Sequence, residues 1–158
     1  MPTEIERKFL VKDSSYKDEA YSSERIVQGY LSSVPLRSVR VRIKGDAAYL
    51  TIKGIGSASG MSRYEWEKPI AVADAEQLLL LCEPGAITKT RYCVRVGDMV
   101  FEVDDFHGDN AGLVMAEIEL QDEAEPFDRP AWLGDEVTGD NKYYNASLSK
   151  NPYRNWRE

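Results

Sequence analysis

Charged and apolar residues alternate along almost every strand-like segment of this chain. The first such segment is EIERKFLV, in which Glu4, Glu6 and Lys8 stand at every second position. Because successive side chains of a β-strand point to opposite faces, these three charged groups share one face. The ordinary interpretation puts that face in water and the apolar face in the core. The other strands of the chain test whether this interpretation holds.

The alternation recurs with same-sign charges next to each other on at least five strands. The basic members are Lys8, Arg40, Arg42, Lys53, Lys89 and Arg91, and the acidic members are Glu4, Glu6, Glu65, Glu67, Glu102, Asp104, Glu117 and Glu119. A solvated face of an antiparallel sheet explains any single pair. It explains the whole set poorly, because like charges on one strand face repel and acidic residues are poor strand formers.

Short alternating runs separated by Gly and Asp predict an α+β fold that is mainly antiparallel β. The predicted strands are 4–11, 28–33, a hairpin over 38–54 that turns at Gly45-Asp46, 62–70, a hairpin over 88–106 that turns at Gly97-Asp98, and 112–121. Strands joined by turns this tight must run antiparallel.

Helices are few in the predicted fold. They are a short helix over 15–21, a helix over 74–82 headed by a capping box at Asp74 and ended by Pro84-Gly85, and a helix at about 140–150 capped by Asp140 and ended by Asn151-Pro152. The sequence has no repeat and no linker-like stretch. We therefore expect one domain over residues 1–158.

Composition limits the functional classes. The chain has 158 residues, of which 42% are hydrophobic, and this suits one globular domain with a core. A net charge of -7 argues against a nucleic-acid surface, and no apolar run reaches the ~20 residues of a membrane helix. Cys82 and Cys93 are too few for a disulfide framework, so we expect a cytoplasmic protein. With His107 as the single histidine, a multi-histidine metal site is not expected.

A closed barrel of about eight strands would give the charged faces an enclosed, wet interior. Helices such as 74–82, with its four leucines, would then cover the apolar outside. The basic residues would bind a polyanion, and the carboxylates would hold divalent cations. Hard oxygen ligands without a Cys/His cluster favour Mg²⁺ or Mn²⁺, as one or two ions. A highly charged anion bound with such a metal indicates a phosphate chain.

The segment EIERK matches the ExExK signature of the CYTH domain, also called the triphosphate tunnel metalloenzyme family. The chain resembles the bacterial branch of that family in further segments, in order: SVRVRIKGDAAYLTIKG, RYEWEKPI, TKTRY, FEVDDFHGDNAGLVMAEIEL and EVTGDNKYYNASL. The resemblance implies an eight-stranded antiparallel tunnel with a charged interior and helices packed outside. It also implies that the tunnel binds a triphosphate, and that the C-terminal helix lies near one tunnel mouth.

Residue roles follow from the same resemblance. It implies phosphate binding by Lys8, Arg40, Arg42, Lys53, Lys89 and Arg91, metal binding by Glu4, Glu6, Glu117 and Glu119, and support of the metal and water by Glu102 and Asp104. We assign catalysis to Lys8, Glu102 and Asp104.

Four further residues have more open roles. Glu65 and Glu67 orient the basic residues, contact a second metal or form interior ion pairs. Lys142 reaches a terminal phosphate or lies on a solvated helix face. Tyr30 points inward as a hydrogen-bonding wall residue.

The expected reaction is metal-dependent hydrolysis of inorganic tripolyphosphate to pyrophosphate and phosphate. The alternatives are a nucleoside or thiamine triphosphatase, a class IV-type adenylyl cyclase, and a non-catalytic triphosphate-binding module. A structural β-domain with a wet charged face is a further alternative. We expect a small-molecule partner, no nucleic acid and no membrane. A homodimer is plausible, because helices could leave part of the apolar outside uncovered.

Overall fold

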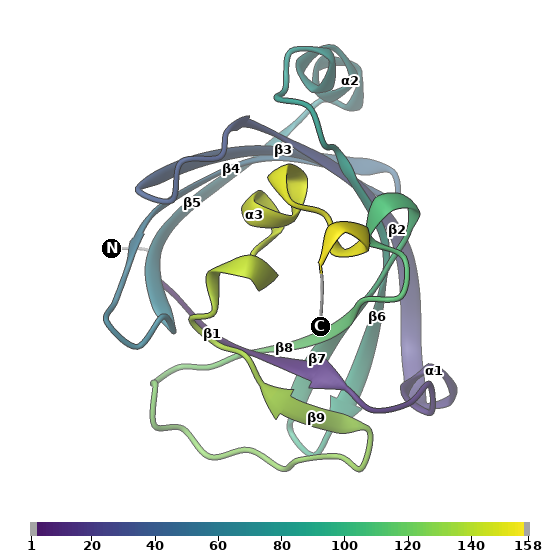
Figure 1. Cartoon of the computed structure of the whole chain (residues 1–158). Helices are drawn as coiled ribbons and strands as arrows, with labels where there is room; N and C mark the ends of the chain where they lie inside the picture. Colours follow the sequence, from purple (N-terminus) through teal and green to yellow (C-terminus); the bar gives the residue numbers. More distant parts are fainter. Residues whose placement is uncertain (1–2, 157–158) are drawn as a thin grey trace.

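The structure is a computed structural model that describes residues 3–156, and eight of its strands close into an antiparallel barrel (Figure 1). The barrel strands are β1 (Thr3–Val11), β2 (Ala20–Ser32), β3 (Arg37–Lys44), β4 (Ala47–Gly56), β5 (Ser62–Ile70), β6 (Ile87–Val96), β7 (Met99–Phe106) and β8 (Val114–Glu119). Around the ring they follow the order β5-β4-β3-β2-β6-β7-β8-β1, and β1 pairs back to β5. The mainly antiparallel β fold and the closed barrel predicted from the sequence are both confirmed.

Strand β1 closes the ring. Residues 3–5 pair with β5 along one edge, and residues 6–10 pair with β8 along the other. Further along the first edge, β1 pairs with a ninth strand, β9 (Leu133–Glu136). Because the ring is closed, its interior is a space enclosed by side chains from every strand.

The two predicted hairpins turn where the sequence indicated. Gly45 and Gly97 begin the two loops with φ values of 58° and 61°, a conformation that other residues rarely adopt. Glycine at these positions therefore fixes both the loop length and the register of the paired strands. In each hairpin the strands pair from the residue that precedes the glycine, Lys44 with Ala47 and Val96 with Met99.

The register brings the charged residues of neighbouring strands opposite one another. Lys8 of β1 faces Glu117 of β8, and Arg91 of β6 faces Asp104 of β7. On the other side of the ring, Lys53 faces Glu65 across β4 and β5. Directly opposite residues of an antiparallel pair lie on the same face of the sheet. The register therefore places the charged residues of these strands together on one face.

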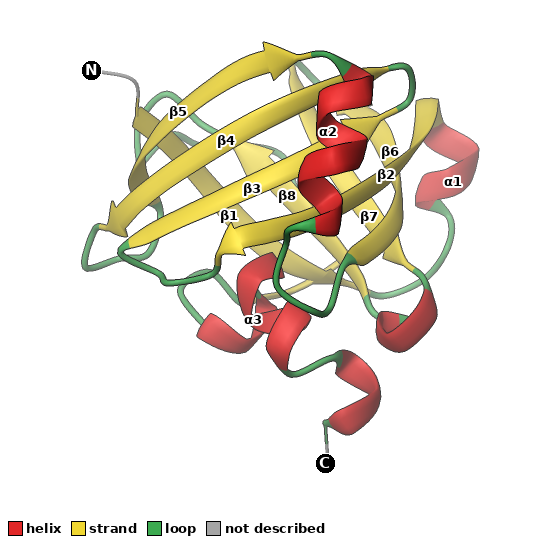
Figure 2. Cartoon of the chain, turned by 90° about the horizontal axis from the view of Figure 1, so that it is seen from above, coloured by secondary structure: helices red, strands yellow, loops and turns green. Residues whose placement is uncertain are grey.

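The apolar phase points outward and is covered. One buried cluster lies outside β1, β7 and β8, and its members are Phe9, Tyr16, Val94, Phe101, Val103, Ala116, Ile118, Leu120, Trp132 and Leu133. Trp132 and Leu133 reach it from the chain around β9, and Tyr16 reaches it from α1 (Tyr16–Glu19). On the opposite side, α2 (Val72–Leu80) lies across the outer face of the sheet near β3 (Figure 2).

The C-terminal segment lies across one opening of the barrel (Figure 1). It contains α3 (Asn145–Lys150) between 3₁₀ turns at Asn141–Tyr143 and Tyr153–Asn155. Leu148 of α3 packs against Ile87, Phe106 and Met115 from the barrel strands. This apolar contact holds the segment at this opening of the barrel.

Several element boundaries differ from the prediction. The predicted strand 28–33 is the end of the longer β2, the helix expected over 15–21 spans four residues, and 112–121 forms a strand over Val114–Glu119. The C-terminal helix is interrupted, because Tyr144 adopts an extended conformation between a 3₁₀ turn and α3. Strand β9 was not predicted, since its four residues include a glycine and two acidic residues.

The predicted capping box of the second helix is wrong. Helix α2 begins at Val72, so Asp74 lies inside its first turn, and the N-cap residue Ala71 makes no side-chain cap. The expected cover by four leucines is also only half correct. Leu78 and Leu79 pack on the barrel, whereas Leu80 and Leu81 are 78% and 72% exposed. Among the described residues, no helix has the length and apolar character that crossing a membrane requires.

Candidate functional site

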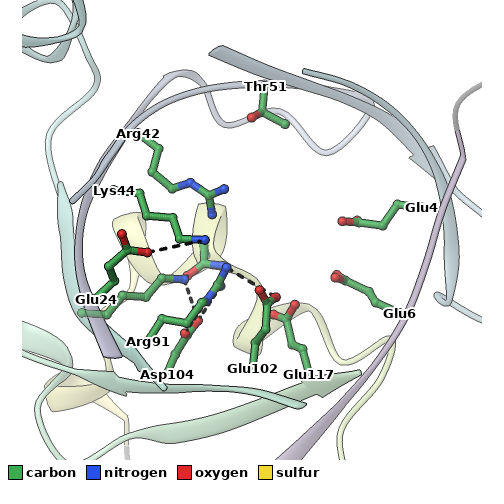
Figure 3. A network of polar contacts seen from close by, with 12 residues as sticks. Glu4, Glu6, Glu24, Arg42, Lys44, Thr51, Arg91, Glu102, Asp104 and Glu117 are labelled. Carbon is green, nitrogen blue, oxygen red and sulfur yellow. Dashed lines mark hydrogen bonds and ion pairs between the residues drawn. The ribbon is translucent and has the colours of Figure 1, made fainter. Parts of the chain in front are cut away.

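A charged tunnel runs through the barrel. Its central part, the tunnel cavity, has a volume of about 180 Å³. It is lined by six basic side chains, seven acidic side chains and one amide, which are Lys8, Arg40, Arg42, Lys44, Lys53, Arg91, Glu4, Glu6, Glu65, Glu67, Glu102, Glu117, Glu119 and Asn145. Figure 3 shows Arg42 of β3 and Arg91 of β6 reaching inward, with Glu4 and Glu6 of β1 reaching in from across the barrel.

Two further hollows adjoin the tunnel cavity. The mouth cavity, of about 400 Å³, lies between the C-terminal segment, the β4–β5 loop and the barrel wall. It shares Glu6, Lys8, Arg40, Lys53 and Asn145 with the tunnel cavity. The second hollow, the acidic groove, has a volume of about 290 Å³ and shares Glu102 and Glu119 with the tunnel cavity. The tunnel cavity therefore shares side chains with both the mouth cavity and the acidic groove.

Lys8 links two of the predicted metal ligands. Its Nζ donates to Glu117 Oε1 at 2.7 Å and lies 3.0 Å from Glu6 Oε1. Burial favours a neutral amine, but Glu117 and Glu6 outweigh it and raise the pKa of Lys8 well above its ordinary value. Burial likewise opposes ionisation of Glu6, yet Lys8 and Lys53 lower its pKa to about 2. The charged forms are therefore the stable ones in this cluster.

Asp104 forms ion pairs with two basic side chains, Arg91 and Lys89, in the wall of the tunnel. Arg91 donates to it through Nε and Nη2 at 2.8 and 2.9 Å, and Lys89 Nζ lies 2.7 Å from Oδ2. Burial alone would raise the pKa of Asp104, but Arg91 and Lys89 hold it well below its usual range. For Lys89, burial is the stronger effect and lowers its pKa to about 8, although Asp104 opposes the shift.

The wall formed by β3, β4 and β5 holds a second set of ion pairs. Glu67 Oε2 lies 3.8 Å from Arg40 and 3.9 Å from Arg42, and it accepts a hydrogen bond from Thr51 Oγ1 at 2.7 Å. Lys53 Nζ lies 2.8 Å from Glu4 and 3.8 Å from Glu65. These contacts are ion pairs inside the barrel, and whether Glu65 and Glu67 also orient the basic residues for a ligand or contact a second metal stays a prediction.

The tunnel has unequal charge along its walls. Burial first, and then repulsion from Arg40 and Arg91, lowers the pKa of Arg42 to about 10, so these three guanidinium groups lie close enough to repel one another. Burial first, and then repulsion from the neighbouring carboxylates, Glu4 before the others, raises the pKa of Glu119, so carboxylates gather on this side. A positive region next to a negative one suits an anion bound together with a cation.

The carboxylates fit a hard divalent cation in their chemistry. In the part of the chain that the structure describes, no three Asp, Glu, His or Cys side chains converge as a preformed metal centre. Glu119 nevertheless has no basic partner within 4.0 Å among residues 3–156, and burial, followed by repulsion from the neighbouring carboxylates, raises its pKa. Glu119, with the carboxylates next to it, therefore supplies the oxygen donors that Mg²⁺ or Mn²⁺ prefers.

The structure brings most of the predicted site residues together. Twelve of them line the tunnel cavity, and Lys89 and Asp104 lie directly behind Arg91. Tyr30 is 6% exposed and lines the mouth cavity. Lys142 is not brought to the tunnel. Its side chain is exposed and lies over Tyr143 and Trp156, with Nζ 4.8 Å from the centre of the Trp156 ring.

Among the cavity residues that sequence reasoning missed are Lys44, Arg63, Thr51 and Asn145. Lys44 continues the phase of Arg42 and pairs with Glu24 at 3.8 Å, while Arg63 continues the phase of Glu65 toward the mouth. The period-two alternation contains both signals. Thr51 and Asn145 gave no such signal, because an uncharged polar residue is common on any strand or helix.

Comparison with known proteins identifies the family. The model of the CYTH domain matches residues 2–152, nearly the whole chain. The chain belongs to the CYTH domain family. This result confirms the resemblance seen in the EIERK segment and in the strands that follow it.

Individual CYTH relatives resemble the chain over almost its full length. An inorganic triphosphatase of Acetivibrio thermocellus is 46% identical over 159 aligned residues, which cover 100% of both chains. An inorganic triphosphatase of Nitrosomonas europaea is 38% identical and covers 93% of this chain and 97% of its own. The crystal structure of the inorganic triphosphatase NE1496 superposes with a TM-score of 0.67 at 35% identity, over 94% of this chain and 95% of that one.

Proposed function

We propose that the protein hydrolyses inorganic triphosphate in the barrel interior. The observation that carries this proposal is the tunnel cavity, in which six basic side chains face seven carboxylates inside a closed ring of strands. The inorganic triphosphatases of Acetivibrio thermocellus and Nitrosomonas europaea are similar over nearly the whole chain and support the same substrate. Hydrolysis of a phosphoanhydride needs positioning and charge neutralisation more than covalent chemistry.

The basic residues act as a clamp on the phosphate chain. Arg40, Arg42 and Arg91 present guanidinium groups to the tunnel from two walls, and Lys8 and Lys53 add ammonium groups. Arginine suits this task because its planar fork matches two oxygens of one phosphate. Asp104 contributes indirectly. It holds Arg91 in place through two hydrogen bonds and is itself 3% exposed, so we assign it a positioning role in place of the catalytic role expected from the sequence.

The carboxylates serve the cation side of the site. Glu4, Glu6, Glu117 and Glu119 would hold one or two Mg²⁺ or Mn²⁺ ions, which neutralise phosphate charge and make bound water more acidic. Among the acidic groups, Glu102 and Glu119 line both the tunnel cavity and the acidic groove. We assign to these two carboxylates the task of orienting the attacking water, because both face the tunnel and its entrance.

A nucleoside triphosphate is the second candidate substrate. The mouth cavity supports it, because about 400 Å³ lies within the range of small-molecule pockets and its wall includes Tyr30, Ile55 and Tyr144. A group attached to the triphosphate would have room there. The two candidates differ in whether the end of the phosphate chain in this cavity is free or esterified.

A phosphate-release assay separates these functions. The substrates are tripolyphosphate, ATP, thiamine triphosphate and pyrophosphate, each with Mg²⁺, with Mn²⁺ or with EDTA, and cyclic AMP is measured in the ATP reactions. We expect metal-dependent release, fastest from tripolyphosphate. Glu117→Gln should lower turnover sharply, whereas Glu76→Gln, an exposed glutamate on α2, should leave it unchanged. Tight tripolyphosphate binding without release from any substrate would instead indicate a binding module.

Two expectations remain predictions. Cys82 and Cys93 are free thiols, which agrees with the expected cytoplasmic setting. The homodimer stays a prediction that rests on Leu80 and Leu81, which leave apolar surface exposed at the end of α2. Sedimentation velocity would measure the oligomeric state directly.

A further inference from the structure

Arg63 is an inward-facing cation that the proposed clamp does not use. It precedes Glu65 by two residues on β5, so it shares the inward phase of that strand. The register places it opposite Glu4 of β1 and Gly56 of β4. Its side chain lines the mouth cavity, in which Lys8 and other clamp residues also lie. Arg63 is therefore positioned where the tunnel opens into the mouth.

Arg63 differs from the clamp in its partners. Each clamp cation has a carboxylate oxygen within 4.0 Å, and the carboxylates concerned are Glu6 and Glu117 for Lys8, Glu67 for Arg40 and Arg42, Glu4 and Glu65 for Lys53, and Glu102 and Asp104 for Arg91. Among residues 3–156, Arg63 has no carboxylate within that distance. Like the Nε atoms of Arg40 and Arg42, its Nε is buried and has no hydrogen-bond partner in the described residues. A buried donor without an acceptor is costly, so the side chain suits an anion supplied by a ligand.

Tyr144 connects Arg63 with the clamp. Lys8 Nζ lies 5.4 Å from the centre of the Tyr144 ring, and Arg63 Cζ lies 5.8 Å from the same centre. The ring comes from the extended residue that precedes α3. One aromatic side chain thus contacts both cations. A phosphate chain held by Lys8 would reach the guanidinium group of Arg63 by extending past this ring.

The chemistry of the two candidate substrates differs at this end of the chain. An inorganic triphosphate ends in a free phosphate with a second ionisable oxygen. In a nucleoside triphosphate, the esterified end has lost that ionisable oxygen and bears a neutral sugar. A guanidinium fork bonds best to two charged oxygens of one group, so Arg63 is suited to the free end.

We propose that Arg63 binds the free terminal phosphate of an inorganic triphosphate in the mouth cavity and so favours this substrate over nucleoside triphosphates. This inference rests on the proposed function, and it makes Arg63 a specificity-determining residue of the same site. Tyr144 is its positioning residue, because the ring lies against the guanidinium and Lys8 together.

The test compares Arg63→Ala with the wild type on tripolyphosphate and ATP under the same metal conditions. Loss of a charge-assisted bidentate contact should lower kcat/KM for tripolyphosphate by about 10- to 100-fold, mainly through KM. For ATP the loss should stay below about threefold, the scale of a weak exposed charge interaction. Arg63→Lys keeps the charge without the fork and should fall in between. Arg25→Ala, an exposed arginine on β2, is the matched control and should change neither value.

Calorimetric titration with tripolyphosphate and with ATP keeps the two proposals separable. If the wild type binds tripolyphosphate without hydrolysing it, the proposed reaction fails, yet Arg63→Ala should still weaken tripolyphosphate binding more than ATP binding. An equal loss for both ligands, or no loss for tripolyphosphate, would overturn the role of Arg63. The melting temperature of each variant shows whether folding is intact, and Arg63→Lys decides the question if the alanine variant does not fold.

Discussion

Replacing Asp104 by asparagine should destabilise the barrel strongly, because its carboxylate neutralises two buried cations. The carboxylate accepts two hydrogen bonds from Arg91, at 2.8 and 2.9 Å, and lies 2.7 Å from Lys89. The Lys89 side chain is 0% exposed and that of Arg91 is 8% exposed. Removing one partner of a buried ion pair costs about 3–5 kcal/mol, since the remaining charge is left without compensation. It also removes the attraction that opposes the fall in the pKa of Lys89.

Differential scanning calorimetry measures the effect. At roughly 2–4 °C per kcal/mol for a domain of this size, the melting temperature should fall by about 6–20 °C. Asp105→Asn is the matched control, because this neighbouring carboxylate belongs to the outward phase and pairs with Lys17 at 3.6 Å near the surface. Such a pair contributes at most about 1 kcal/mol, so its shift should stay below about 4 °C. Equal shifts for the two variants would refute the reasoning that Asp104 compensates buried charge.

Three further predictions concern stability and the mouth. The free energy of unfolding of the metal-free protein should fall between pH 5 and pH 2, because the pKa of Glu6 is about 2 when folded against 4.5 otherwise, and that of Asp104 is also lowered. A carboxylate whose pKa is lower in the folded than in the unfolded protein stabilises the fold above its unfolded pKa, and this stabilisation is lost on acidification. For Glu6 it amounts to about 3 kcal/mol. A free energy of unfolding, measured with urea, that does not change over this pH range would contradict the prediction. Leu148→Ala should lower the free energy of unfolding by about 2–5 kcal/mol, because Leu148 is buried in the mouth cluster, whereas Leu80→Ala at an exposed site should change it by less than about 0.5 kcal/mol. Lys142→Ala should keep kcat/KM for tripolyphosphate within about twofold of the wild type, because its ammonium lies over Trp156 outside the tunnel; a loss as large as that of Arg40→Ala would instead return Lys142 to the phosphate site.

The barrel and its charged lining could be predicted because a period of two determines both. Once Glu4, Glu6 and Lys8 share a face, the matching phase on every other strand makes an enclosed interior the consistent solution. The same rule extends to Lys44 and Arg63, which a complete reading of the period would have included. Gly45 and Gly97 fixed the hairpins, because each begins a tight turn with a positive φ.

The remainder depends on tertiary contacts that a single sequence does not show. Strand β9 and the loop before it form because Trp132 and Phe127 cover the outside of the barrel, although local propensity there is weak. The break at Tyr144 follows from its place at the mouth, where the ring contacts both Lys8 and Arg63. Lys142 lies in the 3₁₀ turn before this break, and its side chain packs over Trp156 outside the tunnel.

The most direct test of the triphosphate tunnel is a crystal structure of the protein soaked with tripolyphosphate and Mn²⁺. We predict phosphate density inside the barrel, bonded to Arg40, Arg42 and Arg91, with a manganese anomalous peak beside Glu119 and its neighbouring carboxylates. Phosphate bound only on the outer surface, or an anomalous signal absent from the acidic side of the tunnel, would contradict the account.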